Sequence, residues 1–159
     1  MRGEGIAALN NGFNGLISML RQDPQAMDSL YLSAITFNRE VHNLIPLVDL
    51  ASYHPIEITC PDSGPTHTGQ ALEMLSDLVK TELVKGSMER KGDWKPLLFI
   101  LTDGKPSDIQ KYRQMIPQIK ALDFGAIVAC AAGPKAEESF LLELTDHVVK
   151  LDATDATTL

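Results

Sequence analysis

Two short stretches of the sequence place oxygen-bearing side chains where a metal ion could bind. In PLLFILTDGKPSD, the apolar residues 97–101 predict a strand buried on both faces, and Asp103 stands at its tip. In SGPTHTGQAL, a Gly-Pro turn presents Thr66 just before a helix expected to begin near Thr68. A hydroxyl and a carboxylate are hard oxygen ligands, the kind that Mg²⁺ or Mn²⁺ takes. We therefore predict a partial metal site formed by Thr66 and Asp103.

Two neighbouring residues belong to the same predicted site. Gly104 is the turn residue after Asp103, and His67 follows Thr66, although a plain surface-loop position is the simpler interpretation of this histidine. A structural interpretation of the whole arrangement also exists, in which Thr68 only caps its helix and Asp103 only closes a turn. Spacing alone leaves both interpretations open.

Motifs for other kinds of chemistry are missing from the sequence. It contains neither GxGxxG nor GxxxxGK[ST], so it has no phosphate-binding loop for a nucleotide. The four histidines are scattered, without the spacing of a zinc site. No GxSxG nucleophile elbow is present.

Composition bounds the class of protein. A chain of 159 residues is long enough for a single domain with a real core, here expected over 1–159. Its 21 acidic and 14 basic residues give a net charge of -7, which argues against nucleic acid as a partner. No apolar run approaches the roughly 20 residues of a membrane helix, so no membrane partner is expected. Without an apolar signal region or a cysteine framework, a cytoplasmic location is the expectation.

Helix and strand signals alternate along the chain. Periodicity predicts helices near 6–20, 68–83, 109–119 and 140–144, and strands near 30–37, 41–48, 97–101, 126–131 and 147–151. Residues 51–65 are polar and Pro-rich and predict a loop, and Pro117 is expected to break or kink the third helix. The first two strands suit a hairpin, and Pro46 favours an edge position for it.

This pattern predicts an α/β fold: a doubly wound, mainly parallel sheet with helices on both faces and one antiparallel edge hairpin. Ligands of such sheets bind at the carboxyl ends of the strands. Asp103 stands at one of these ends, so the fold prediction and the site prediction agree.

Several segments together resemble a known family. MRGEGIAALNNGFNGLISMLRQDP, LYLSAITFN, GPTHTGQAL, GDWKPLLFILTDGKPSD and AIVACAAG are similar to von Willebrand factor A (VWA) domains of the bacterial tellurite-resistance, TerY-like branch, across essentially the whole chain. Such domains carry a metal-ion-dependent adhesion site (MIDAS), built from Asp-x-Ser-x-Ser after the first strand, a loop Thr and a later Asp. By this resemblance Thr66 is the loop threonine, Asp103 the later aspartate and Gly104 its turn residue.

The resemblance implies a binding module and not an enzyme. In the family, Mg²⁺ or Mn²⁺ binds an acidic residue of a protein partner through an open coordination position, in systems associated with tellurite resistance and stress. The first strand with its Asp-x-Ser-x-Ser is missing from this chain, and in the family it lies between the strands at 30–37 and 97–101. We therefore expect a truncated domain, absent or weak metal binding, and free strand edges that favour a homo-oligomer or strand exchange.

Two rival functions remain open. One is a Mg²⁺-dependent, receiver-like phosphoryl-transfer domain with Asp103 as the acceptor. Receivers need an acidic pair after the first strand and a Lys after the last-but-one strand, where this chain has Ala131, Ala132 and Gly133. The other is a purely structural partner domain whose metal site has been lost.

Overall fold

The computed structural model describes residues 4–60, 64–89, 91–132 and 136–151 as five helices and five strands. In chain order the elements are α1 (Glu4–Leu20), α2 (Pro24–Ser29), β1 (Tyr31–Phe37), β2 (Val41–Asp49), α3 (Thr68–Glu82), β3 (Leu97–Thr102), α4 (Ile109–Lys120), β4 (Ala126–Ala132), α5 (Glu138–Leu144) and β5 (Val148–Leu151).

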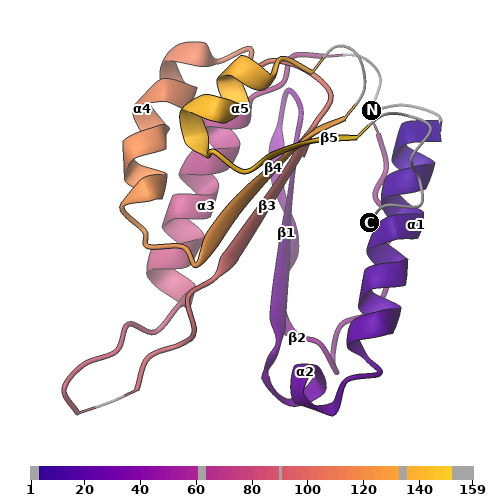
Figure 1. Cartoon of the computed structure of the whole chain (residues 1–159), viewed down its shortest axis with the longest axis vertical. Coiled ribbons are helices and arrows are strands. Elements are labelled where there is room, and N and C mark those ends of the chain that lie inside the picture. The colour runs from indigo at the N-terminus through magenta and orange to yellow at the C-terminus, as the bar shows by residue number, and fades with distance from the viewer. Residues whose placement is uncertain (1–3, 61–63, 90, 133–135, 152–159) are drawn as a thin grey trace.

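The strands form two separate sheets. Strands β3, β4 and β5 are parallel in that order, whereas β1 and β2 form an antiparallel hairpin (Figure 1). The mixed α/β class and the parallel sheet agree with the prediction, but a full doubly wound sheet with the hairpin as its edge is wrong. The physical reason is that no described strand lies between β1 and β3 to join their backbones, so each keeps a free edge. The sheets separate where the resemblance placed the first strand.

The helices divide between two sides. Helices α3, α4 and α5 lie together on one side, and α1 lies beyond the hairpin on the other (Figure 1). Helix α3 packs against both α4 and the hairpin, so it joins the two halves. The two larger clusters of buried side chains follow from this division. Under α3 and α4 they are Leu72, Ile100, Tyr112, Met115, Ile116, Ile119 and Leu144, and between α1 and the hairpin they are Ile17, Ile45, Leu50 and Tyr53.

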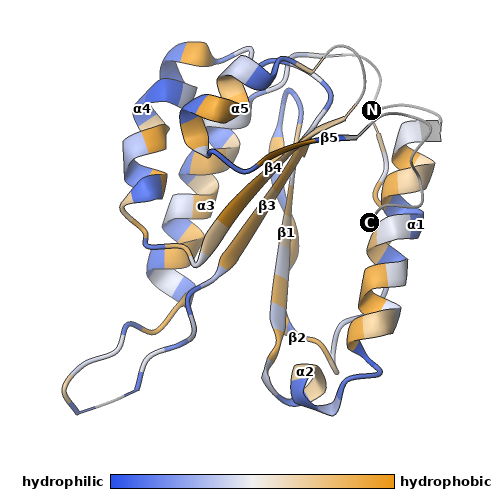
Figure 2. Ribbon diagram, viewed as in Figure 1, coloured by the Kyte–Doolittle hydropathy of each residue, from blue (hydrophilic) through white to orange (hydrophobic). Residues whose placement is uncertain are grey.

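Among the described residues, no helix covers one face of the parallel sheet. Alternate residues of β3 point to opposite faces, and Ile100 is buried whereas Leu97 and Phe99 are 63% and 61% exposed. Val149 of β5 is also exposed. Figure 2 shows β3 and β4 as predominantly hydrophobic along their length. The sheet therefore carries apolar side chains on both faces but is covered by helices on one.

Two local features differ from the predictions. Helix α2 was not predicted, although Asp23 caps it by accepting from the Gln25 and Ala26 amides and Pro24 occupies its first turn. Pro117 lies inside α4 without ending it. Because α4 ends three residues later, at Lys120, a proline there disturbs little of the helix.

No helix among the described residues is long and apolar enough to cross a membrane.

Candidate functional site

The predicted site residues lie on two loops that meet at the carboxyl end of β3. We call residues 64–67, before α3, the α3 loop, and residues 103–108, between β3 and α4, the β3 loop. A Cβ placed on Gly104 would lie 3.8 Å from Thr66 Oγ1. The structure therefore brings the Thr66 hydroxyl beside the turn that follows Asp103. The metal-binding role of these residues stays a prediction.

Asp103 is held at the tip of β3 by a tight turn. Thr102 pairs with Ala131 of β4 and is buried, with 6% of its surface exposed. Its hydroxyl donates to the Gly104 carbonyl at 3.2 Å and accepts from the Gly104 amide at 3.4 Å. The half-buried Asp103 thus leaves the sheet on a turn that Thr102 closes with its own side chain.

His67 connects the α3 loop to the hairpin. Its amide donates to the Asn38 carbonyl at 2.9 Å, and its ring Nδ1 lies 2.9 Å from the Arg39 carbonyl oxygen. Because a carbonyl can only accept, Nδ1 carries the proton in this contact. The structure therefore gives His67 an anchoring role between the two halves of the fold.

Two residues that were not assigned a role from the sequence hold the α3 loop from the other side. The Thr66 amide donates to Ser107 Oγ at 2.9 Å, and the Ser107 amide donates to the Thr66 carbonyl at 2.8 Å. The Asp108 carboxylate accepts from the Gly69 amide at 3.0 Å and from the Gln70 amide at 2.9 Å. The sequence signal for these two residues was Pro-Ser-Asp, the end of TDGKPSD. Spacing along the chain does not connect this tripeptide to a helix some 39 residues away.

The capping of α3 differs from the structural interpretation of Thr68. The helix does begin at Thr68, but its N-cap position is His67, and the capping oxygens come from Asp108. Thr68 is 3% exposed, and its hydroxyl finds no hydrogen-bond partner among the described residues. Thr68 is therefore not the capping residue.

Because the Asp108 carboxylate already lies at the positive, N-terminal end of α3, a second anion would gain little there.

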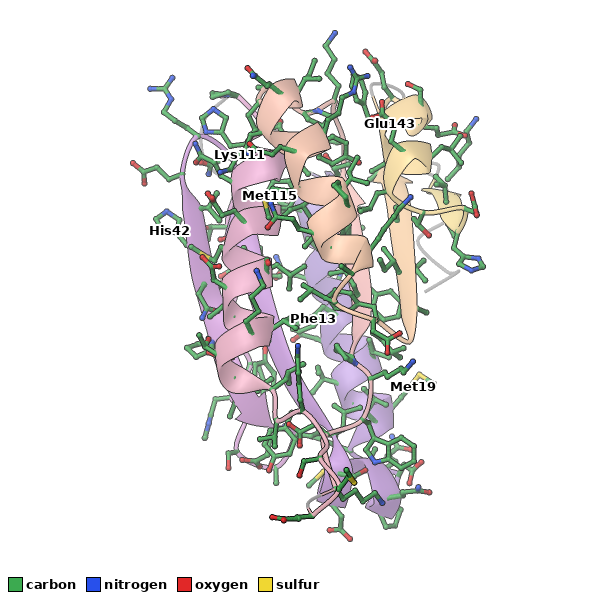
Figure 3. The ribbon with its side chains drawn as sticks, turned by 90° about the vertical axis from the view of Figure 1, so that its left-hand side faces the viewer. Phe13, Met19, His42, Lys111, Met115 and Glu143 are labelled. Carbon is green, nitrogen blue, oxygen red and sulfur yellow. The ribbon has the colours of Figure 1, made fainter. Side chains whose placement is uncertain are left out.

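Charge around the two loops is largely paired. Lys105 of the β3 loop lies 3.5 Å from Glu137, and Lys111 of α4 forms an ion pair with Glu73 of α3. In Figure 3, α3 and α4 lie side by side with Lys111 near their upper ends.

The described residues contain no group of three or more His, Cys, Asp and Glu that could hold a metal. Thr66 and Asp103 are oxygen donors that fit a hard cation such as Mg²⁺ or Mn²⁺, and they supply only part of a ligand shell.

Comparison with known proteins identifies the fold. No family model matches the sequence, and no curated protein matches it. Among solved structures, the chain is similar to proximal thread matrix protein 1 (PTMP1) from the mussel byssus, with a TM-score of 0.67 and 14% identity over 98% of this chain. A second crystal form of PTMP1 gives the same values, and a third structure of it has a zinc-occupied MIDAS motif.

The similarity concerns the fold alone. This chain spans 40–41% of the length of the PTMP1 chains that it matches. At 14% identity, side-chain roles do not transfer from one protein to the other. PTMP1 is a VWA-domain protein with a MIDAS motif. The similarity in structure therefore shows that this chain has a VWA-like fold. Membership of the TerY-like branch has no support beyond the segments that resemble it.

Proposed function

We propose that this chain is a VWA-type binding module that recognises an acidic group of a protein partner through a divalent cation held by Thr66 and Asp103. The observation that carries the proposal is the meeting of the two predicted ligand loops, with Thr66 Oγ1 3.8 Å from the Cβ position of Gly104. The VWA-like fold supports it, because such a fold brings ligands to the carboxyl ends of its strands.

The chemistry of the two residues sets the kind of cation and its affinity. Asp103 supplies one negative charge and Thr66 one neutral oxygen, which suits Mg²⁺ or Mn²⁺. A bound cation supplies positive charge and an open coordination position for a partner's carboxylate. Mg²⁺ requires near-octahedral geometry and parts reluctantly with its waters, so two protein ligands hold it weakly. Binding by this chain should therefore be weak.

The net charge explains why a cation is needed for this partner. A chain with a net charge of -7 repels an acidic surface on average. A divalent cation at the contact reverses that repulsion locally, and the partner's Asp or Glu then completes the coordination. A cytoplasmic role in tellurite resistance or stress response is the biological setting that the sequence resemblance favours.

Paramagnetic Mn²⁺ is a suitable probe because it broadens nearby amide signals even when binding is weak. Titration of Mn²⁺ into the labelled chain should broaden the amides of Thr66, His67, Asp103 and Gly104 first. Asp103→Ala should remove this localised broadening. Asp77→Asn, which neutralises an exposed carboxylate further along α3, should leave it intact.

Two results would overturn the proposal. One is broadening spread evenly over the acidic surface of the wild-type chain. The other is a broadening pattern that does not change in Asp103→Ala, because the ion would then bind without the predicted ligand.

The phosphoryl-transfer alternative gains no support from the structure. Strand β4, the last but one, ends at Ala132, and the chain has no Lys at the position that a receiver requires. Incubation with acetyl phosphate should leave the intact mass unchanged. A gain of one phosphoryl group on Asp103 would favour the alternative instead.

A further inference from the structure

Ser107 and Asp108 join the two site loops across a large separation in sequence. The four hydrogen bonds between them and residues 66–70 have donor–acceptor distances of 2.8 to 3.0 Å. Each links segments 38 to 41 residues apart. Among the described residues, the Asp108 carboxylate accepts from two backbone amides at the start of α3, so it binds the beginning of that helix.

Close packing of α3 on α4 reinforces the same connection. Asp108 immediately precedes α4, and the Gly69 position has no room for a Cβ against Tyr112 or Asp108. Tyr112 is fully buried. The first turns of both helices are therefore locked to each other at the end of the molecule that carries Thr66 and Asp103.

From these contacts we infer that Ser107 and Asp108 are positioning residues of the proposed metal site. They form a clasp, defined here as the side chains of Ser107 and Asp108, that keeps Thr66 Oγ1 beside the tip of β3 before any ion binds. This inference rests on the proposed function. Because the ligands are already placed, the ion does not have to order the α3 loop, and affinity rises accordingly.

The clasp acts on one ligand more than on the other. Asp103 leaves β3 on a turn that Thr102 closes with its own hydroxyl, a contact that does not involve the clasp. Thr66 belongs to the α3 loop and has its amide and carbonyl bonded to Ser107. Loss of the clasp should therefore detach Thr66 from the ion while Asp103 still binds it.

The test combines Mn²⁺ broadening with amide hydrogen exchange on Asp108→Ala. Exchange of the Gly69 and Gln70 amides should accelerate, because their acceptor is gone. Relative to wild type, Mn²⁺ should broaden Thr66 and His67 less than it broadens Asp103 and Gly104, and the apparent affinity should fall by about 10-fold or more. Asp108→Asn keeps one acceptor oxygen and should lie between wild type and Asp108→Ala.

Glu73→Ala is the matched control. It removes the Lys111–Glu73 ion pair between the same two helices without touching either loop, so the Mn²⁺ pattern should not change. If Asp108→Ala does not fold, Ser107→Ala replaces it, since Ser107 is exposed and its side chain accepts from the Thr66 amide.

The possible outcomes separate the two proposals. If wild type shows no localised broadening, the proposed function fails and the clasp has no site to position. If wild type broadens at both loops and the clasp variants do the same with equal affinity, the clasp inference is overturned while the proposed function stands. If Glu73→Ala matches Asp108→Ala, the effect belongs to helix packing in general and the inference is also overturned.

Discussion

Gly69 at the start of α3 lies directly against the backbone nitrogen of Tyr112 in α4, with no space between them for a side chain. A Cβ on Gly69 would also lie 2.8 Å from the Lys111 carbonyl carbon. Gly69→Ala should therefore push the helices apart and lower the free energy of unfolding by about 1–3 kcal/mol. Urea denaturation measures this change.

Gly15 provides the matched control for that substitution. It lies inside α1, and a Cβ there would meet nothing within 4 Å. Gly15→Ala should raise the free energy of unfolding by roughly 0.5–1 kcal/mol, because alanine loses less backbone freedom in a helix. Equal effects of the two substitutions would show that α3 and α4 are less closely packed than described.

The Arg113–Glu143 pair should make stability depend on acidity. Arg113 Nη2 lies 2.8 Å from Glu143 Oε1, joining α4 to α5 in a two-pronged contact. Hydrogen bonding by Arg113 lowers the pKa of Glu143 below its ordinary value of 4.5. A carboxyl group whose folded pKa is lowered contributes stability above its unfolded pKa and loses it as pH falls through the folded pKa.

Comparison of wild type with Glu143→Gln tests this dependence. The side chains are 58% and 33% exposed, so solvent screens the pair and its contribution to stability at neutral pH is small. The difference in unfolding free energy between the two proteins should shrink as the pH falls below 4.5. A difference that stays constant over this range would contradict the assignment.

Tyr112 should make stability depend on alkaline pH in the opposite sense. Its hydroxyl donates to the Phe140 carbonyl at 2.6 Å, and burial raises the pKa of Tyr112 well above its ordinary value of 10. The stability tied to the protonated phenol is complete below the unfolded pKa and is lost as pH rises toward the folded pKa. Tyr112→Phe should cost about 1 kcal/mol at neutral pH and weaken the alkaline loss.

Tyr31→Phe is the control for the tyrosine prediction. Tyr31 is 62% exposed, so its hydroxyl should affect neither the neutral-pH stability nor the alkaline loss. Unfolding followed in denaturant at several pH values measures both variants. An alkaline profile of Tyr112→Phe identical to that of wild type would contradict the role of this hydroxyl.

The uncovered face of the parallel sheet should cause self-association. Leu97, Phe99 and Val149 expose apolar side chains there, and β1 and β3 have free edges that another strand can pair with. Leu16 and Met19 of α1 are exposed as well, and Met19 lies at the molecular surface in Figure 3. We expect a concentration-dependent increase in mass by light scattering.

Substitutions on two faces test where that association occurs. Phe99→Thr keeps a strand-forming residue but removes apolar surface, and it should lower the association. Leu142→Ser removes a side chain that is 51% exposed on α5 and should leave the association unchanged. A wild-type chain that stays monomeric at high concentration would contradict the prediction.

Local sequence determined the elements that depend on neighbouring residues. The apolar runs near 97–101 and 126–131 correspond to β3 and β4, and the 3.6-residue period after Thr68 corresponds to α3. These signals are strong because a strand or helix repeats its pattern over a few residues. The position of Asp103 at a strand tip followed from the same local signal.

The tertiary structure alone decided how these elements meet. The separation into two sheets depends on whether a strand lies between β1 and β3, which no local pattern in either strand records. Likewise, the cap that Asp108 places on α3 joins residues 38 and 39 positions apart, and the same Asp is a good cap for its own helix by sequence rules. Local patterns thus determine which residues can form helices, strands and ligands, because those properties depend on chain neighbours. Which of them come together depends on long-range packing, where a hydrogen bond between distant residues leaves no periodic trace in the sequence.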